Sequence, residues 1–79
     1  MDRKEILEKL QTIFRDVFDD EELIITEETT PEDIEDWDSI GHTYLAVEIS
    51  DEFGLRPDAQ MQHIESVGDI VNLICEKIT

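Results

Sequence analysis

The sequence predicts an all-α protein, a small bundle of three main helices and one short helix with a long loop between the first two main helices. Three stretches repeat apolar residues at steps of three and four, the spacing of an amphipathic helix. No stretch alternates apolar and polar residues as a half-buried strand does. A chain of 79 residues has room for one hydrophobic core, so we expect residues 1–79 to form a single domain.

The first helix is expected over residues 3–18. Asp2 followed by Glu5 resembles a capping box, in which the Asp2 carboxylate accepts hydrogen bonds from amide groups at the helix start. The four acidic residues at 19–22 would be unfavourable at the negative end of the helix dipole, so the helix should end before them. The stripe that should face the core contains Ile6, Leu10, Ile13, Phe14 and Val17, widened by Leu7 and Phe18.

The segment 19–38 is expected to be an acidic loop. It contains 11 of the 22 acidic residues and no Lys or Arg. A loop of this length is uncommon in a compact domain unless it packs on the core or carries function. Thr30 before Pro31 is typical of a helix cap with proline at the first helical position, which predicts a short helical turn ending near Trp37. The apolar residues expected to anchor the loop are Leu23, Ile24, Ile25, Ile34 and Trp37.

The second main helix is expected over residues 39–53. Helical spacing returns at Ser39, and Gly54 supplies the left-handed residue that commonly ends a helix. Two apolar rows run along this segment, one with Ile40, Tyr44 and Val47 and the other with Leu45, Ile49 and Phe53.

A short helix of one or two turns is expected at 58–64, carrying Met61 and Ile64. Ser66 and Asp69 repeat the capping-box pattern, which predicts the start of the last helix. The stripe of this helix is formed by Val67, Ile70, Val71, Ile74 and Ile78.

The charge of the chain excludes several classes of function. Twenty-two acidic and 6 basic residues give a net charge of −16, which repels nucleic acids and acidic membrane surfaces and favours basic protein partners. No apolar run approaches the roughly 20 residues of a membrane helix, and no signal-peptide core follows Met1, so we expect a cytosolic protein. Cys75 cannot form an internal disulfide and is expected to be buried and inert.

The candidate functional residue is Ser39, at the start of the second main helix. Its hydroxyl lies at the positive end of the helix dipole, where a phosphate ester would be favourable, although Asp38 and Ser39 are equally ordinary N-cap residues. A nucleophile elbow is excluded because Trp37 occupies the required glycine position. His42 lies on the same helix face, but no acid orients it, so a solvated surface histidine is expected, and His63 is read in the same way.

A dedicated metal site is not expected. An EF-hand template that begins at Asp36 places Ile40 and Val47 where oxygen ligands are required. The acidic cluster would then attract cations only diffusely.

Taken together, the acidic chain of this length, the helix order and Asp38-Ser39-Ile40 at a helix start resemble the acyl carrier proteins over nearly the whole chain. The signature of that family is Asp-Ser-Leu, and Asp-Ser-Ile is a conservative form of it. Trp37 before this motif, with Gly41 and His42 after it, is similar to stand-alone carriers that serve specialised pathways.

The resemblance implies that Ser39 carries a covalent 4′-phosphopantetheine arm, with Asp38 beside it. A separate, magnesium-dependent phosphopantetheinyl transferase would supply the arm from coenzyme A. The terminal thiol of the arm would hold acyl groups as thioesters for enzymes of fatty acid, polyketide or other specialised acyl-transfer pathways, so the protein itself would be a carrier and no enzyme.

The resemblance also implies a docking surface and a cleft. Acidic residues of the second helix would dock on basic patches of the acyl-transfer and acyl-loading enzymes, although a solvated face is the ordinary reading of each residue. Gly41 and Tyr44 stand where the family often has acidic residues. We therefore expect partner enzymes that differ from those of the housekeeping fatty-acid carrier. The docking candidates are Ile40, Glu48, Asp51 and Glu52. The acyl-cleft candidates, which are core residues by their spacing, are Leu45, Ile49, Leu55, Met61, Ile64 and Ile70.

Three alternative functions remain open from the sequence. A peptidyl or aminoacyl carrier would use the same serine and the same arm. An unmodified acidic adaptor would bind one basic partner through its second helix, and a divalent-cation sensor would use the acidic cluster. A monomer without nucleic-acid or membrane partners is expected in each case.

Overall fold

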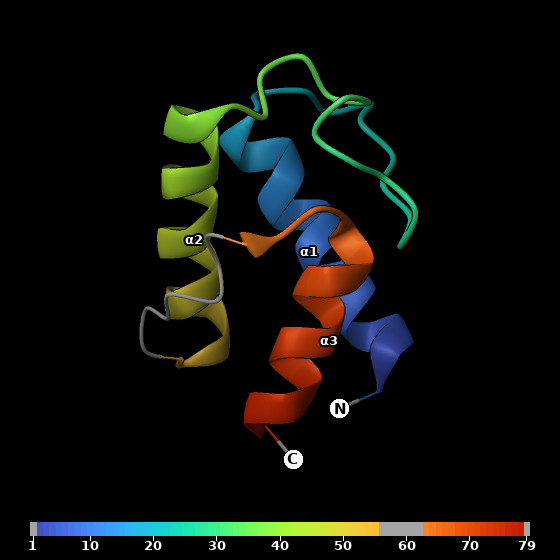
Figure 1. Cartoon of the computed structure of the whole chain (residues 1–79), viewed down its shortest axis with the longest axis vertical. Helices are drawn as coiled ribbons and strands as arrows, with labels where there is room; N and C mark the ends of the chain where they lie inside the picture. The colour runs from blue at the N-terminus through green and yellow to red at the C-terminus, as the bar shows by residue number, and fades with distance from the viewer. Residues whose placement is uncertain (1, 56–62, 79) are drawn as a thin grey trace.

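The computed structural model describes residues 2–55 and 63–78. Within them the chain forms three helices, α1 (Arg3–Val17), α2 (Ser39–Phe53) and α3 (Val67–Ile78), and no strand. In Figure 1, α1 and α2 run in opposite directions, α3 lies in front of α1, and both termini lie at one end of the bundle. The predicted all-α fold is therefore confirmed. The short helix predicted at 58–64 lies largely outside the described residues, as does Met61.

The helix ends follow the capping signals in the sequence. The Asp2 carboxylate accepts from the Glu5 amide at 2.8 Å, and the Asp38 carboxylate accepts from the Gly41 amide at 2.9 Å. Gly54 ends α2 with a φ of 65°, in the left-handed region that glycine adopts without strain. The bounds predicted for α2 are confirmed, and α1 ends one residue earlier than predicted.

The capping pattern before α3 is confirmed in one of its two bonds. The Ser66 hydroxyl accepts from the Asp69 amide at 3.3 Å. The Asp69 carboxylate, however, accepts from the Glu65 amide at 3.0 Å, one residue before the position that a capping box uses. The Asp69 carboxylate therefore fixes the backbone of the residues that precede α3.

The core is formed where the apolar faces of the helices meet. Only the second of the two apolar rows on α2 faces it, with Leu45 and Ile49 buried and Phe53 half-buried. The first row points to solvent, because Ile40, Tyr44 and Val47 are 70%, 64% and 54% exposed. The remaining buried helical residues are Ile6, Leu10, Ile13 and Phe14 from α1 and Val67, Ile70, Val71, Leu73 and Ile74 from α3.

The long loop is held to the core, as predicted, but by fewer side chains. Ile25, Ile34 and Trp37 are buried and Leu23 is half-buried, whereas Ile24 is 73% exposed. The prediction for Ile24 was wrong because an irregular segment has no period that separates neighbouring side chains. The amide side chain of Gln11 supplements these anchors, since it donates to the Leu23 carbonyl and accepts from the Ile25 amide.

The helical turn predicted after Thr30 is replaced by two separate turns. The Asp33 amide donates to the Thr30 carbonyl at 2.9 Å, and the Trp37 amide donates to the Ile34 carbonyl at 3.1 Å. The Asp33 carboxylate accepts from the Thr30 amide, so the capping signal is satisfied without a helix behind it.

Arg3 connects α1, the loop and α3. Its guanidinium forms an ion pair with Glu27 of the loop and donates to the Asn72 side chain of α3 at 2.7 Å. The hydrogen bond between the Arg3 and Glu27 side chains lowers the pKa of Glu27 and raises the pKa of Arg3. The Glu27 carbonyl also accepts from the Gly68 amide at 2.8 Å, so the same loop residue covers the start of α3. In the part of the chain that is described, no helix is long and apolar enough to cross a bilayer.

Candidate functional site

Ser39 lies at the end of the bundle away from both termini, as the first residue of α2 (Figure 1). Its side chain is exposed. The first amide groups of a helix lack partners within the helix and carry the positive end of its dipole. The Asp38 carboxylate satisfies the Gly41 amide, and the other amides of the first turn belong to Ser39 and Ile40. An anion attached to the Ser39 hydroxyl would therefore be stabilised by this helix end.

Trp37 and His42 form a hydrogen-bonded pair of rings across the start of α2. The indole Nε1–H donates to Nδ1 of His42 at 3.0 Å, and the ring centroids lie 6.2 Å apart at an interplanar angle of 19°, so the two rings meet edge to edge. The indole also forms a T-shaped pair with the ring of Phe14 of α1, with the ring centroids 5.2 Å apart at an interplanar angle of 88°. His42 is half-buried, so the expectation of a solvated histidine was wrong. Because its Nδ1 accepts from Trp37, this nitrogen does not serve Ser39 as a base.

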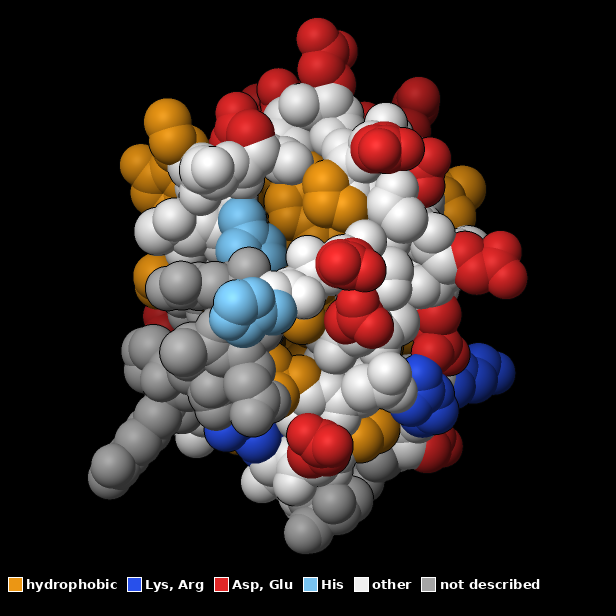
Figure 2. All heavy atoms as spheres, viewed as in Figure 1, with side chains coloured by type: hydrophobic (Ala, Val, Ile, Leu, Met, Phe, Trp, Pro, Cys, Tyr) orange, Lys and Arg blue, Asp and Glu red, His pale blue; other side chains and the backbone are white. Residues whose placement is uncertain are grey.

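A depression beside Ser39 has His42 among its lining residues. Figure 2 shows the two histidine side chains on one face of the molecule. The volume of the depression is about 290 Å³. Its walls combine apolar and polar groups, which come from Pro31, Trp37, Asp38, Ser39, His42 and Ile64.

Gly41 lies where the acidic loop passes closest to the start of α2. A Cβ atom at this position would lie 2.4 Å from the Asp36 carbonyl oxygen and 3.0 Å from Cε1 of Phe18. Any side chain would therefore push the loop away from α2. The close approach brings the segment before Ser39 against the helix and leaves no room for an acidic residue at 41.

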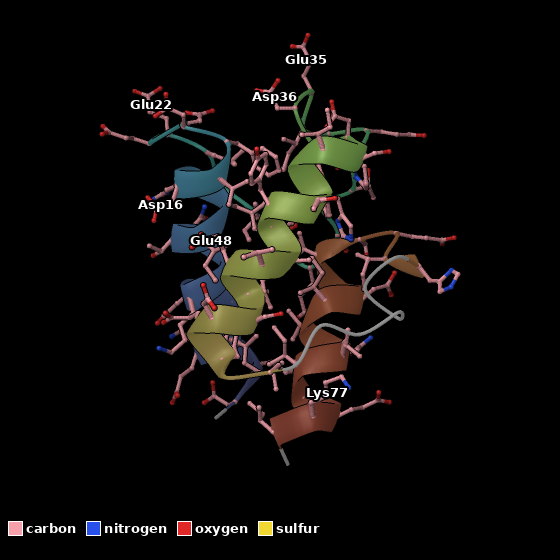
Figure 3. The ribbon with its side chains drawn as sticks, turned by 90° about the vertical axis from the view of Figure 1, so that its left-hand side faces the viewer. Asp16, Glu22, Glu35, Asp36, Glu48 and Lys77 are labelled. Carbon is pink, nitrogen blue, oxygen red and sulfur yellow. The ribbon has the colours of Figure 1, made fainter. Side chains whose placement is uncertain are left out.

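Acidic side chains surround the exposed row of α2. Figure 3 shows Asp16 and Glu48 on neighbouring helices of one side, with Glu35 and Asp36 beyond the start of α2. A groove of about 350 Å³ between α1 and α2 is lined by Asp16, Val17, Tyr44 and Glu48. No Lys or Arg occurs between Arg15 and Arg56 of the sequence, so the negative charge of the α2 side of this surface is not offset by basic residues of the same segment.

One docking candidate, Glu52, differs from the other three in its surroundings. Glu48 and Asp51 are exposed, and so is Ile40. Glu52 is exposed as well, but its carboxylate accepts from Lys9 of α1 at 3.2 Å. The exposed apolar residues Tyr44 and Val47 were not among the candidates, because sequence spacing alone does not show which of two apolar rows faces the core.

The acyl-cleft candidates divide into core and edge residues. Leu45, Ile49 and Ile70 are buried in the main cluster. Leu55 and Ile64 are half-buried at its edge, and Ile64 lines the depression beside Ser39. Their role in a cleft stays a prediction.

The acidic side chains and Cys75 were also considered as metal ligands. Within residues 2–55 and 63–78, no three His, Cys, Asp or Glu side chains converge on a position that could hold a metal ion. Cys75 is half-buried at the edge of the core, rather than fully buried as expected.

Comparisons with known proteins agree with this geometry. No protein-family model matches the chain. Acyl carrier proteins of Lactobacillus acidophilus and Rubrobacter xylanophilus are 35% and 32% identical to it, over 94% and 100% of this chain and 94% and 99% of their own lengths. The acyl carrier protein of Thermotoga maritima is 34% identical over 96% of this chain and 95% of its own.

A solved structure shows the same arrangement of helices. The solution structure of the holo acyl carrier protein of Geobacter metallireducens matches with a TM-score of 0.82 and 36% identity, covering 91% of this chain and 84% of that chain. Proteins with this name are carriers rather than enzymes. On its sequence and its fold, the chain belongs to the acyl carrier protein family.

Proposed function

We propose that the protein carries acyl groups as thioesters on a 4′-phosphopantetheine arm attached to the Ser39 hydroxyl. The observation that carries this proposal is the exposure of Ser39 at the first position of a 15-residue helix. An incoming transferase can reach this hydroxyl, and the helix end favours the phosphodiester that results.

The other two serines of the chain are poor attachment points. Ser50 lies in the middle of α2 and is half-buried, away from either helix end. Ser66 is half-buried, and its hydroxyl caps α3 by accepting from the Asp69 amide. Modification of Ser66 would remove this cap at a cost of about 1 kcal/mol. Ser39 alone combines an exposed hydroxyl with a helix N-terminus.

The residues around Ser39 fit a phosphodiester and the arm that follows it. Asp38 is fixed by its bond to the Gly41 amide, so its carboxylate keeps its position when an anion is added nearby. The depression lined by Trp37 and His42 adjoins the attachment point. When bound, the arm supplies a terminal thiol that carries acyl groups as thioesters. The protein holds this arm and presents it to other enzymes.

We further propose that the exposed face of α2 docks on a phosphopantetheinyl transferase and on acyl-transfer enzymes with basic patches. Ile40 supplies apolar contact area next to Ser39, and Glu48 and Asp51 supply negative charge. Such contacts act mainly on encounter rate and specificity, and salt weakens them. Fatty acid, polyketide and other specialised acyl-transfer pathways all use this chemistry, and the acyl-loading enzyme decides between them.

The proposal is tested by coexpression with a phosphopantetheinyl transferase, followed by measurement of the intact mass. The wild-type protein and Ser50→Ala should each gain one phosphopantetheine, whereas Ser39→Ala should gain none. A wild-type protein that stays unmodified with several transferases would contradict the proposal and favour an unmodified adaptor. Loading of the modified protein with acyl and with aminoacyl substrates then separates an acyl carrier from a peptidyl carrier.

A further inference from the structure

The hydrogen bond between Trp37 and His42 joins the end of the acidic loop to α2, and it depends on the charge of one ring. Nδ1 of His42 can accept from the indole N–H only while this nitrogen carries no proton, so the neutral imidazole holds its proton on Nε2. Protonation turns both ring nitrogens into donors, and two donors cannot share a hydrogen bond. We infer that the Trp37–His42 bond is a proton-sensitive latch, closed while His42 is neutral and released when His42 becomes charged.

Release of the latch affects the core as well as the surface. The indole of Trp37 is 5% exposed and forms a T-shaped pair with Phe14 of α1. Without Nδ1 of His42 as its acceptor, the indole N–H is left in a site that excludes water, which destabilises the folded protein. The stability contributed by the latch is therefore present above the ordinary titration range of histidine and is lost as pH falls through that range. The junction that positions Ser39 loosens in the same step.

Charged groups near the latch move the pH at which it opens. Asp36 and Asp38 precede α2 in the chain, and Asp38 lines the same depression as His42. Their carboxylates favour the charged imidazole. The second histidine of the chain, His63, lies on the same face and opposes that charge when it is itself protonated (Figure 2). These groups do not alter the outcome, because a protonated Nδ1 cannot accept from Trp37 whatever its surroundings.

A negative charge on Ser39 biases the latch toward release. Ser39 and His42 are three residues apart in α2, a spacing that puts their Cβ atoms about 5–6 Å apart on one face of the helix. Both residues line the same depression. A phosphodiester on Ser39 therefore favours the charged imidazole, so attachment of the arm raises the pH at which the latch opens. This step rests on the proposed function, whereas the latch itself belongs to the unmodified protein.

Nuclear magnetic resonance of the unmodified protein tests the latch between about pH 8 and pH 5, the range in which histidine changes charge. At the upper end, the nitrogen shifts of the imidazole should show the proton of neutral His42 on Nε2. As His42 titrates, the indole N–H resonance of Trp37 should shift with the same midpoint and exchange faster with water. An indole resonance that does not follow the titration of His42, or a neutral ring with its proton on Nδ1, would overturn the inference.

Two variants identify the group to which the indole responds. His63→Ala changes an exposed histidine and should leave the titration of the Trp37 indole resonance intact, whereas His42→Ala should abolish it. A response that is lost in His63→Ala and kept in His42→Ala would overturn the inference. The titration of the wild-type protein decides the matter even where His42→Ala folds poorly.

The loaded protein tests the link to Ser39. Loading is first established by intact mass, so an unmodified protein shows a failure of the proposed function and leaves the test of the latch unaffected. The titration midpoint of His42 should be higher in the loaded than in the unloaded protein, with a smaller change for His63. Equal midpoints of His42 in the two forms would overturn the link between the arm and the latch.

Discussion

The indole N–H of Trp37 donates to Nδ1 of His42 at 3.0 Å, and this bond joins the two nearly parallel rings edge to edge, one helical turn from Ser39. Trp37 ends the acidic loop and His42 belongs to the first turns of α2, so this bond fixes the junction at which Ser39 lies. The stability of the junction and the environment of the attachment point therefore depend on the same pair of side chains.

A double-mutant cycle measures the strength of this pair. His42→Ala leaves the indole N–H of the buried Trp37 without its acceptor, which should lower the free energy of unfolding by about 1–3 kcal/mol. Trp37→Phe removes the donor, so adding His42→Ala to it should cost less than in the wild type. Urea unfolding followed by circular dichroism gives the four values, and strictly additive losses would contradict the pairing.

The close approach at Gly41 makes an unusual prediction for a helical glycine. Replacement of such a glycine by alanine ordinarily stabilises a protein by about 0.5–1 kcal/mol. At Gly41 the new Cβ would lie 2.4 Å from the Asp36 carbonyl oxygen, so Gly41→Ala should instead destabilise by about 1–3 kcal/mol. Urea unfolding measures the change. A variant as stable as the wild type would show that the loop does not need this approach.

The ion pair of Arg3 and Glu27 predicts a dependence on pH. The bond to Arg3 lowers the pKa of Glu27 below its ordinary value of 4.5, so the pair contributes stability above that pH and loses it as pH falls through the folded-state pKa. A double-mutant cycle with Arg3→Met and Glu27→Gln isolates the pair from the general repulsion among carboxylates. The coupling free energy should be present at neutral pH and absent well below the ordinary pKa of Glu27, and a constant value would contradict the assignment.

Two exposed isoleucines offer a matched test of the docking face. Ile40 on α2 and Ile24 in the loop are 70% and 73% exposed, so neither contributes much to the core. Ile40→Ala should raise the KM of a phosphopantetheinyl transferase for the unmodified protein about fivefold to thirtyfold, the equivalent of about 1–2 kcal/mol. Ile24→Ala should leave it unchanged. Equal effects of the two substitutions would place docking elsewhere.

The helices were predictable from the sequence because their signals are local. The Asp38 cap and the left-handed Gly54 mark both ends of α2, and the predicted bounds of this helix agree with the structure. The place of Ser39 at a helix start was predictable for the same reason, since it depends only on neighbouring residues.

The loop and the surroundings of Ser39 were less predictable because they depend on contacts between distant segments. Ile24 and Ile25 are equivalent by composition, and only their exposed fractions in the structure, 73% and 4%, show which one faces inward. The contact of Trp37 with His42 is local by comparison, because these residues hold the N′ and N4 positions of α2, which meet in a hydrophobic staple. That spacing predicts a contact, but it does not predict the hydrogen bond between the two rings.

The most direct test of the account locates the prosthetic group along the chain. Fragmentation of the loaded, intact protein in a mass spectrometer should place the whole added mass on Ser39, with fragments that contain only Ser50 or Ser66 unchanged. Added mass on either of those residues, or a protein that no transferase modifies, would contradict the assignment of Ser39 as the attachment point.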